Sequence, residues 1–354
     1  PSAAVALPRS KPTPEPAPLA DAVAKALAAH GGSWQTWQAE VAPFHAEVKK
    51  RLAALPHDAK ALAGEDGYLF FRASLEYLVG GDLASQPPDK NPLPVILAFK
   101  KLLEAHGVDF LFVPVPTKAE IFPDELGPMG KPFVGKVVNP CLLKLAQELS
   151  QQGVEVVDLL TPFLAARAKG GAPGEEPLFQ HQDTHWTDRG LRLAADILVK
   201  RVARYPWYSA LQTHAQHFDL KDASFTRFGD LVSRLPEAKK TRYRPETLVA
   251  HQVLRGDGTP YEDDADSPVV VLGDSFTGVY ELTDAEHAGV SAHLARGISY
   301  PVDLVMSYGG GPNVRQKLMR RGAAALDGKK LVVWLMTARD LYNYWEAWEP
   351  IRDQ

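Results

Sequence analysis

Short runs of almost uninterrupted apolar residues recur from the first third of the chain to its end. Runs of this length without strict alternation are typical of strands that are buried on both faces. The runs that we expect to form strands are residues 67–71, 108–115, 154–159, 269–272 and 331–336.

Amphipathic stretches, in which apolar residues recur every three or four positions, separate these runs. They predict helices over 21–30, 33–55, 94–106, 137–152, 161–169, 187–204 and 312–325, with Ser33 as a plausible N-cap. Because strands alternate with helices, the pattern predicts an α/β fold with a mostly parallel central sheet between helical layers.

Changes in composition divide the chain into three parts. Residues 1–20 are rich in Pro and Ala, so we expect a flexible tether there. Residues 21–63 are expected to form helices packed on the main domain, which spans 64–354 with a less regular insertion around 205–266. The first residue is Pro rather than Met, which indicates a processed chain with a possible signal or membrane tether upstream of Pro1.

Charge and cysteine content narrow the class of protein. A net charge of -4 at pH 7 gives no reason to expect a nucleic-acid partner. The apolar runs are far shorter than the ~20 residues that a membrane-spanning helix needs. Cys141, the single cysteine, lies in an amphipathic stretch and is expected to be a buried structural thiol. The compartment stays open, because oxidising compartments permit disulfides without requiring them.

The stretch VVVLGDSFTGVY (269–280) joins one expected strand to a serine. Ser275 follows the strand almost directly, and Gly273 permits a tight turn. Ligands bind at the carboxyl ends of parallel strands, where a following helix would direct backbone N–H groups toward the serine. The hydroxyl is therefore placed for nucleophilic attack, while the alternative is a serine that only caps the helix. This stretch alone leaves both interpretations open.

A serine nucleophile needs a base, and the best candidate lies in HQDTHWTDRG (181–190). His185 stands two residues after Asp183, and positions i and i+2 of an extended segment point to the same side. Asp183 would then hold one imidazole nitrogen while the other faces Ser275. One alternative is a metal site formed by His181, Asp183 and His185, for which the sequence shows no obvious fourth ligand. Another is that Asp183 or Thr187 caps the following helix.

These motifs resemble a known family. GDSF (273–276) resembles the first block of the SGNH (GDSL-like) hydrolases. DTHW (183–186), which precedes it, is similar to the Asp-x-His-Trp signature of the alginate O-acetyltransferase family of AlgJ and AlgX proteins. Further similar stretches are GEDGYLFF, VPVPTKAEIFPDEL, RFGDL, YGGGPN and LVVWLMTARDLY. The resemblance extends from about Gly64 to Tyr344.

The resemblance implies an SGNH-hydrolase-like three-layer α/β/α sandwich with a catalytic triad. Ser275 would be the nucleophile, His185 the base and Asp183 the carboxylate that orients the base. The Ser275 N–H would be one oxyanion donor. Weaker candidates complete the expected oxyanion and substrate site: Gly310, Gly311, Asn313, Lys118, Arg339 and Tyr342. For these residues a glycine turn, an ion pair or a packing role is an equal alternative.

The resemblance also implies an activity: O-acetyl transfer to an extracytoplasmic polysaccharide, such as alginate or a cellulose-like glycan, through acetyl-Ser275. No cofactor or metal is implied. A membrane-bound acyltransferase would pass on the acetyl donor within an exopolysaccharide secretion complex in the periplasm. A carbohydrate acetylesterase with the same triad and a non-catalytic polysaccharide-binding scaffold remain alternatives. Trp345 and Trp348 are expected either to stack on sugar rings or to pack in a C-terminal helix.

Overall fold

The structure is a computed structural model that describes residues 18–170 and 174–351, so most of the expected tether lies outside it. Helix α1 (Pro18–Ala29) begins inside the stretch assigned to that tether, and α2 (Trp34–Ala53) follows it. Ser33 caps α2 as expected, because its hydroxyl accepts a hydrogen bond of 3.1 Å from Thr36 N. Both helices pack on α6 (Pro140–Gln151), and their buried side chains join the main hydrophobic core.

The central sheet has five strands in the order β4-β3-β9-β7-β8, and all of its pairings are parallel. Its strands are β3 (Asp109–Val115), β4 (Glu155–Val156), β7 (Val269–Gly273), β8 (Asp303–Met306) and β9 (Leu331–Thr337). Strands β7 and β9 are buried along their whole length, which is why their sequences are continuously apolar. The predicted α/β fold with a mostly parallel sheet is confirmed.

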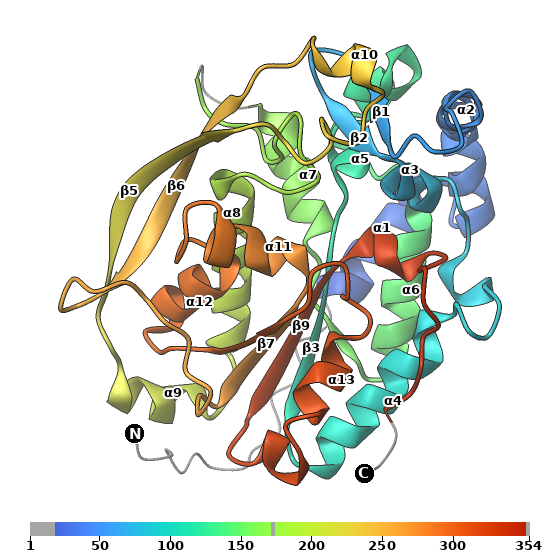
Figure 1. Ribbon diagram of the computed structural model, residues 1–354. Coiled ribbons are helices and arrows are strands. Elements are labelled where there is room, and N and C mark those ends of the chain that lie inside the picture. The colour runs from blue at the N-terminus through green and yellow to red at the C-terminus, as the bar shows by residue number, and fades with distance from the viewer. Residues whose placement is uncertain (1–17, 171–173, 352–354) are drawn as a thin grey trace.

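Helices cover both faces of this sheet (Figure 1). The helices α8 (Asp188–Val202) and α12 (Val290–Ile298) lie on one side, and α4 (Pro92–Ala105), α6 and α13 (Val314–Met319) lie on the other. The chain moves from β3 outward to β4 and from β7 outward to the opposite edge at β8, and β9 then returns between β3 and β7. The carboxyl ends of β3, β9 and β7 therefore lie side by side, at the edge where α/β sheets bind ligands.

The region around 205–266 is more regular than the sequence indicated. Strands β5 (Phe218–Arg227) and β6 (Glu246–Arg255) form an antiparallel ribbon, paired from Phe218 opposite Arg255 to Arg227 opposite Glu246. Its positions are mostly exposed or partly buried and include many polar residues, so no apolar run marks it. The ribbon lies along the side of the α8 and α12 layer (Figure 1).

Several expected elements need correction. The apolar run 67–71 gives β2 (Leu69–Phe71), which pairs with β1 (Ala61–Ala63) in a separate antiparallel sheet. Strand β8 was missed because its burial alternates at the sheet edge and leaves no apolar run. The helix expected over 312–325 stops at α13 and resumes as a 3₁₀ turn after Gly322, whose φ is 92°.

The remaining helices are short and connect the larger elements. The α-helices are α3 (Arg72–Leu78), α5 (Lys118–Ile121), α7 (Leu160–Lys169), α9 (Tyr208–Leu211), α10 (Glu237–Lys240) and α11 (Ser275–Gly278). The other helical turns are η1 (Leu83–Ser85), η2 (Pro123–Leu126), η3 (Pro128–Phe133), η4 (Gln212–His214), the π-helical η5 (Val279–Thr283), η6 (Ala323–Leu326) and η7 (Ala338–Leu341).

Two further expectations can be compared with the structure. Cys141 is buried, as predicted, and burial raises the pKa of its thiol. None of the helices in the described part of the chain has the length and apolarity needed to cross a bilayer.

Candidate active site

The Asp183–His185 pair lies on a tight turn before α8. This turn is closed by a bridge between Phe179 and Trp186 and by a hydrogen bond of 3.1 Å from Gln180 N to the His185 carbonyl. Asp183 Oδ1 accepts two hydrogen bonds from His185, at 2.6 Å from the ring Nδ1 and 2.9 Å from the backbone N. The two side chains therefore converge, through a local turn that also fixes the imidazole ring.

The second oxygen of Asp183 is held by the ribbon. Asp183 Oδ2 accepts hydrogen bonds from Arg227 Nη1 at 2.6 Å and from Asp230 N at 2.7 Å. Burial alone would raise the pKa of this carboxyl, but the charge and hydrogen bond of His185, the Arg227 guanidinium and the Asp230 amide hold it well below its usual range. Because these partners outweigh the effect of burial, Asp183 is an ionised carboxylate although it is only 1% exposed.

Lys118 holds the backbone of the same turn. It begins α5, directly after β3, and its ammonium donates to the carbonyl oxygens of Gln180, His181 and Asp183 at 2.8, 2.9 and 2.6 Å. Burial lowers the pKa of Lys118 to about 8. The structure thus directs this ammonium to backbone carbonyls rather than to a bound acceptor, which differs from the role the sequence suggested.

Ser275 is the first residue of α11, directly beyond β7, and its side chain is half-buried. The capping role belongs to its neighbour, because Asp274 Oδ1 accepts a hydrogen bond of 2.8 Å from Phe276 N. Asp274 Oδ2 accepts another of 2.7 Å from Thr337 N, which ties this turn to the end of β9. The interpretation of Ser275 as a simple helix cap therefore has no support in the geometry.

The serine turn and the histidine turn meet through one aromatic side chain. The ring of Phe276, next to Ser275, lies 4.8 Å from the ring of His185 and 5.2 Å from that of Trp186. The outer imidazole nitrogen, Nε2 of His185, is buried and forms no hydrogen bond with any described residue. Catalytic hydrogen bonds are often long or unformed without substrate, so this free nitrogen is compatible with a base that faces Ser275.

The expected oxyanion residues are placed unequally. Gly311 lies beside the serine turn, since a Cβ on it would be 3.3 Å from Asp274 Oδ2. The Gly310 N–H donates to Ser307 O at 3.0 Å, and the Asn313 N–H donates to Gly310 O at 3.0 Å. The side-chain amide of Asn313 donates to Glu346. The structure therefore brings Gly311 to the serine turn, whereas the donors of Gly310 and Asn313 are used elsewhere.

The residues after β9 also divide into two groups. The Arg339 guanidinium lies 5.8 Å from the ring of Phe276, so it borders the serine turn. Tyr342 instead packs on Gly80, where a Cβ would be 2.4 Å from its ring. Trp345 is 71% exposed, whereas Trp348 is buried against Trp334, and no helix forms there. Trp345 therefore remains accessible to a ligand and Trp348 does not.

The contacts of Arg227 and Asp230 with Asp183 were not predicted from the sequence. Arg227 and Asp230 belong to RFGDL, which was noted as similar to the family but lay in the region expected to be irregular. Asp230 Oδ1 also accepts a hydrogen bond of 2.7 Å from Thr184 N. The one available signal was the family motif itself, because no spacing along the chain links the ribbon to Asp183.

The alternative of a metal site can be compared with these contacts. His181 Nδ1 is bonded to Glu246 at 2.8 Å, so it belongs to a different cluster from His185. Asp183, His185 and Asp230 do bring one potential ligand atom each within 4.8 Å of one another. However, both oxygens of Asp183 already accept N–H groups, and one of these belongs to a positively charged arginine. These donors are better suited to a hydrogen-bonded carboxylate than to a cation ligand.

The fold and the site together define an SGNH-hydrolase-like domain: a parallel α/β sheet with Gly-Asp-Ser at the end of one strand and an Asp–His pair beside it. The family model described as the SGNH hydrolase-like domain of the acetyltransferase AlgX matches residues 61–338. The chain belongs to this family, as its motifs indicated.

Relatives and solved structures agree with this assignment. A probable alginate O-acetylase AlgJ of Pseudomonas putida is 27% identical over 174 residues, covering 49% of this chain and 41% of that protein. Another, of Pseudomonas syringae pv. tomato, is 24% identical over 224 residues, covering 60% of this chain and 53% of the relative. The chain thus spans about half the length of the curated relatives it matches.

The solved structures show the same fold at low identity. The O-acetyltransferase domain of Pseudomonas putida AlgJ has a TM-score of 0.63 at 22% identity, covering 80% of this chain and 92% of that one. Pseudomonas aeruginosa AlgX has a TM-score of 0.59 at 16% identity, covering 80% of this chain and 67% of that one.

Proposed function

We propose that the chain is a serine-dependent O-acetyltransferase that places acetyl groups on an extracytoplasmic polysaccharide. The family assignment and the names of the AlgJ relatives support this activity. The observation that carries it is the buried Asp183–His185 hydrogen bond of 2.6 Å, on a turn whose imidazole packs 4.8 Å from the residue next to Ser275. A helix cap or a packing role would need no such pair.

The first half of the reaction forms an acetyl-enzyme. Asp183 accepts from Nδ1 of His185, which selects the tautomer whose Nε2 has a free lone pair. Nε2 takes the proton of the Ser275 hydroxyl as its oxygen attacks the acetyl carbonyl. The resulting oxyanion would be met by N–H groups at the start of α11, with the Ser275 amide as first candidate. The donor's leaving oxygen then departs with the proton held by His185, and acetyl-Ser275 remains.

The second half transfers the acetyl group. His185 Nε2 takes a proton from a sugar hydroxyl, whose oxygen attacks acetyl-Ser275. When the tetrahedral intermediate collapses, the Ser275 oxygen leaves with that proton and the acetylated sugar is released. Water in place of the sugar would give an acetylesterase with the same residues, so the acceptor site and the exclusion of water decide between the two activities.

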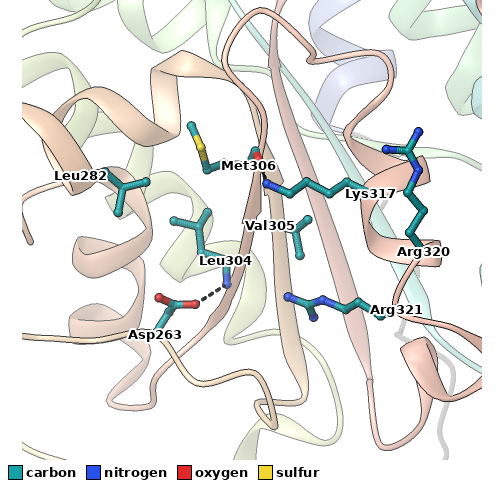
Figure 2. A pocket seen from close by; sticks show the side chains of 8 residues that line it. All are labelled: Asp263, Leu282, Leu304, Val305, Met306, Lys317, Arg320 and Arg321. Atoms are coloured by element: carbon teal, nitrogen blue, oxygen red, sulfur yellow. Dashed lines mark hydrogen bonds between the residues drawn. The ribbon is translucent and has the colours of Figure 1, made fainter.

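A groove along the edge strand β8 supports an anionic polymer as acceptor, and its volume is about 480 Å³. Figure 2 shows its lining, with Lys317, Arg320 and Arg321 on one side and Asp263 as its acidic residue. One end reaches Met306, which pairs with Gly273 just before the serine turn. Arg321 is paired with the carboxylate of Asp303 at 2.6 and 2.9 Å, so Lys317 and Arg320 supply the remaining positive charge. This charge favours a carboxylate-bearing glycan such as alginate over a neutral, cellulose-like glycan.

The localisation and partners follow from the same proposal. We expect the domain to work outside the cytoplasm, in an exopolysaccharide complex where a membrane-bound acyltransferase passes on the acetyl donor. Fractionation of cells that express the full-length gene product tests this. Recovery of the protein in the cytoplasmic fraction alone would contradict the assignment.

Mass spectrometry after incubation with p-nitrophenyl acetate and sugar oligomers tests the activity. Wild-type protein should carry acetyl on Ser275 and then pass it to the oligomer. Ser275→Ala and His185→Ala should do neither, whereas Ser209→Ala, which removes an exposed hydroxyl, should match the wild type. Acetate release without a modified oligomer would identify an esterase toward these acceptors. Equal labelling of Ser275→Ala and wild type would overturn the proposed nucleophile.

A further inference from the structure

Arg227 ends strand β5 and bridges two carboxylates from distant parts of the chain. Its Nη1 lies 2.6 Å from Asp183 Oδ2, while its Nε and Nη2 lie 3.0 and 2.9 Å from the two oxygens of Asp284. We propose that Arg227 is a positioning residue, which clamps the Asp183–His185 turn to the segment that follows Ser275. This inference rests on the proposed function, because it assigns a part in the same acetyl transfer.

The clamp connects the two turns that must meet for catalysis. Asp284 directly follows η5, which continues from the serine helix α11, whereas Asp183 precedes α8. The guanidinium also donates to Gln180 Oε1 at 3.2 Å, so it contacts the start of the histidine turn as well. Proton transfer requires the base and the hydroxyl at hydrogen-bond distance, and a misplacement of about 1 Å can cost roughly 100-fold in rate.

Gly229, two residues after Arg227, lets the end of the ribbon lie close to the backbone of the histidine turn. A Cβ on Gly229 would lie 2.2 Å from the carbonyl carbon of Gln182 and 2.7 Å from Asp183 N, so only glycine fits there. The next residue, Asp230, donates its N–H to Asp183 and accepts from Thr184 N. The end of the ribbon is therefore packed directly on the backbone that carries the Asp–His pair.

The charges around the pair make the clamp testable by pH. Arg227 and Asp230 reach it from the ribbon, Lys118 from α5, Asp284 from the segment after Ser275, and Arg339 lies across Phe276. Both carboxylates raise the pKa of Arg227 against the effect of burial, so it stays charged. Removal of Arg227 takes a fixed positive charge away from the Asp183 carboxylate, so the acid limb of the pH–activity profile should move to higher pH.

Steady-state kinetics with p-nitrophenyl acetate across pH, on the whole chain, separates charge from geometry. Arg227→Gln should lower kcat/KM about 10- to 100-fold and move its acid limb to higher pH. Arg227→Lys keeps the positive charge but loses the several N–H donors of the guanidinium that reach both carboxylates. It should therefore lower kcat and leave the acid limb of the pH profile near the wild-type position. Asp284→Asn should lower kcat without moving the limb to higher pH. The control Arg255→Gln removes a partly exposed arginine at the other end of the ribbon and should match the wild type.

The outcomes separate this proposal from the proposed function. If Ser275→Ala retains wild-type turnover, the acyl-enzyme mechanism itself is wrong. If Ser275 is required but Arg227→Gln keeps both the wild-type rate and pH limb, the clamp alone is refuted. Melting curves in parallel identify a purely structural role: loss of thermal stability with unchanged kcat/KM and pH profile of the folded fraction would also refute the clamp.

Discussion

The ammonium of Lys118 lies 2.6 Å from the carbonyl oxygen of Asp183, the residue whose carboxylate orients His185. Asp183 therefore contacts Lys118 through its backbone carbonyl and the His185 imidazole through its side chain. The position of the Asp183 backbone and the orientation of the His185 imidazole therefore depend on each other.

Replacement of Lys118 by methionine keeps an unbranched side chain, one atom shorter, and removes its charge. The carbonyls of Gln180, His181 and Asp183 would lose their buried donor, and each unsatisfied group costs about 1–3 kcal/mol. We expect lower thermal stability and lower esterase activity, measured by calorimetry and p-nitrophenyl acetate hydrolysis. Lys131→Met, at an exposed lysine, is the control. An unchanged melting temperature and rate would show that the turn holds its shape without Lys118.

Asp183→Asn should preserve the fold but place the imidazole proton on the wrong nitrogen. An asparagine amide can donate to Nδ1, and Nε2 would then carry the proton and lose its role as base; in a related triad such a change lowers kcat about 10⁴-fold. Single-turnover acetylation of Ser275 measures the effect. Asp196→Asn changes an exposed carboxylate on α8 and should behave as the wild type. A loss of less than about tenfold would argue against Asp183 as the orienting carboxylate.

Gly229→Ala should disrupt the site by steric overlap alone. The new methyl group would lie 2.2 Å from the backbone of Gln182, which no side-chain rotation can relieve. Gly256→Ala places a methyl group directly after the ribbon strand β6, at 3.4 Å from its nearest neighbour, which is ordinary contact. We expect the first variant to lose stability and activity and the second to keep both. Equal behaviour of the two variants would mean that the ribbon end moves freely.

The groove along β8 should affect the acceptor and not the acetyl-enzyme. Arg320→Glu reverses an exposed charge that lines it, so the KM for an oligouronate acceptor should rise by about tenfold at low salt, and less at high salt. Hydrolysis of p-nitrophenyl acetate should not change. Lys200→Glu makes the same charge change on α8, away from the groove, as a control. Equal use of neutral and anionic oligomers by the wild type would contradict the anionic acceptor.

Glu281 should make stability depend on pH between its unfolded and folded pKa values. Burial raises the pKa of Glu281 to about 7, although its Oε2 accepts from Gly289 N, Ser291 Oγ and Ala292 N. The folded state therefore binds the proton more tightly than the unfolded chain. Glu281 contributes fully to stability below about pH 4.5, and this contribution is lost as the pH rises through about 7. Chemical denaturation from pH 4 to 8 should show this decline, by at most about 3 kcal/mol. Glu281→Gln should flatten it, and an unchanged slope would contradict the assignment.

Much of the architecture could be predicted from local patterns. Strands β3, β7 and β9 are buried on both faces, so their apolar runs were visible without a structure. Asp183 and His185 are close in sequence, so the two-residue spacing was enough to expect their contact. Strand β8 and the ribbon were missed because an edge strand and a half-exposed hairpin have no distinctive run.

The sequence by itself therefore determined the elements with local signals: the apolar strands, the capped helices, the Gly-Asp-Ser turn and the Asp-x-His pair. Only the tertiary structure decided which side chains serve that pair. Lys118 turns to three backbone carbonyls, and Asn313 turns to Glu346 rather than to the serine. Arg227 reaches Asp183 and Asp284 from a ribbon far away in sequence. Periodicity reports which face of an element is buried, but contacts between distant segments depend on how the whole chain packs, and a single sequence does not encode them locally.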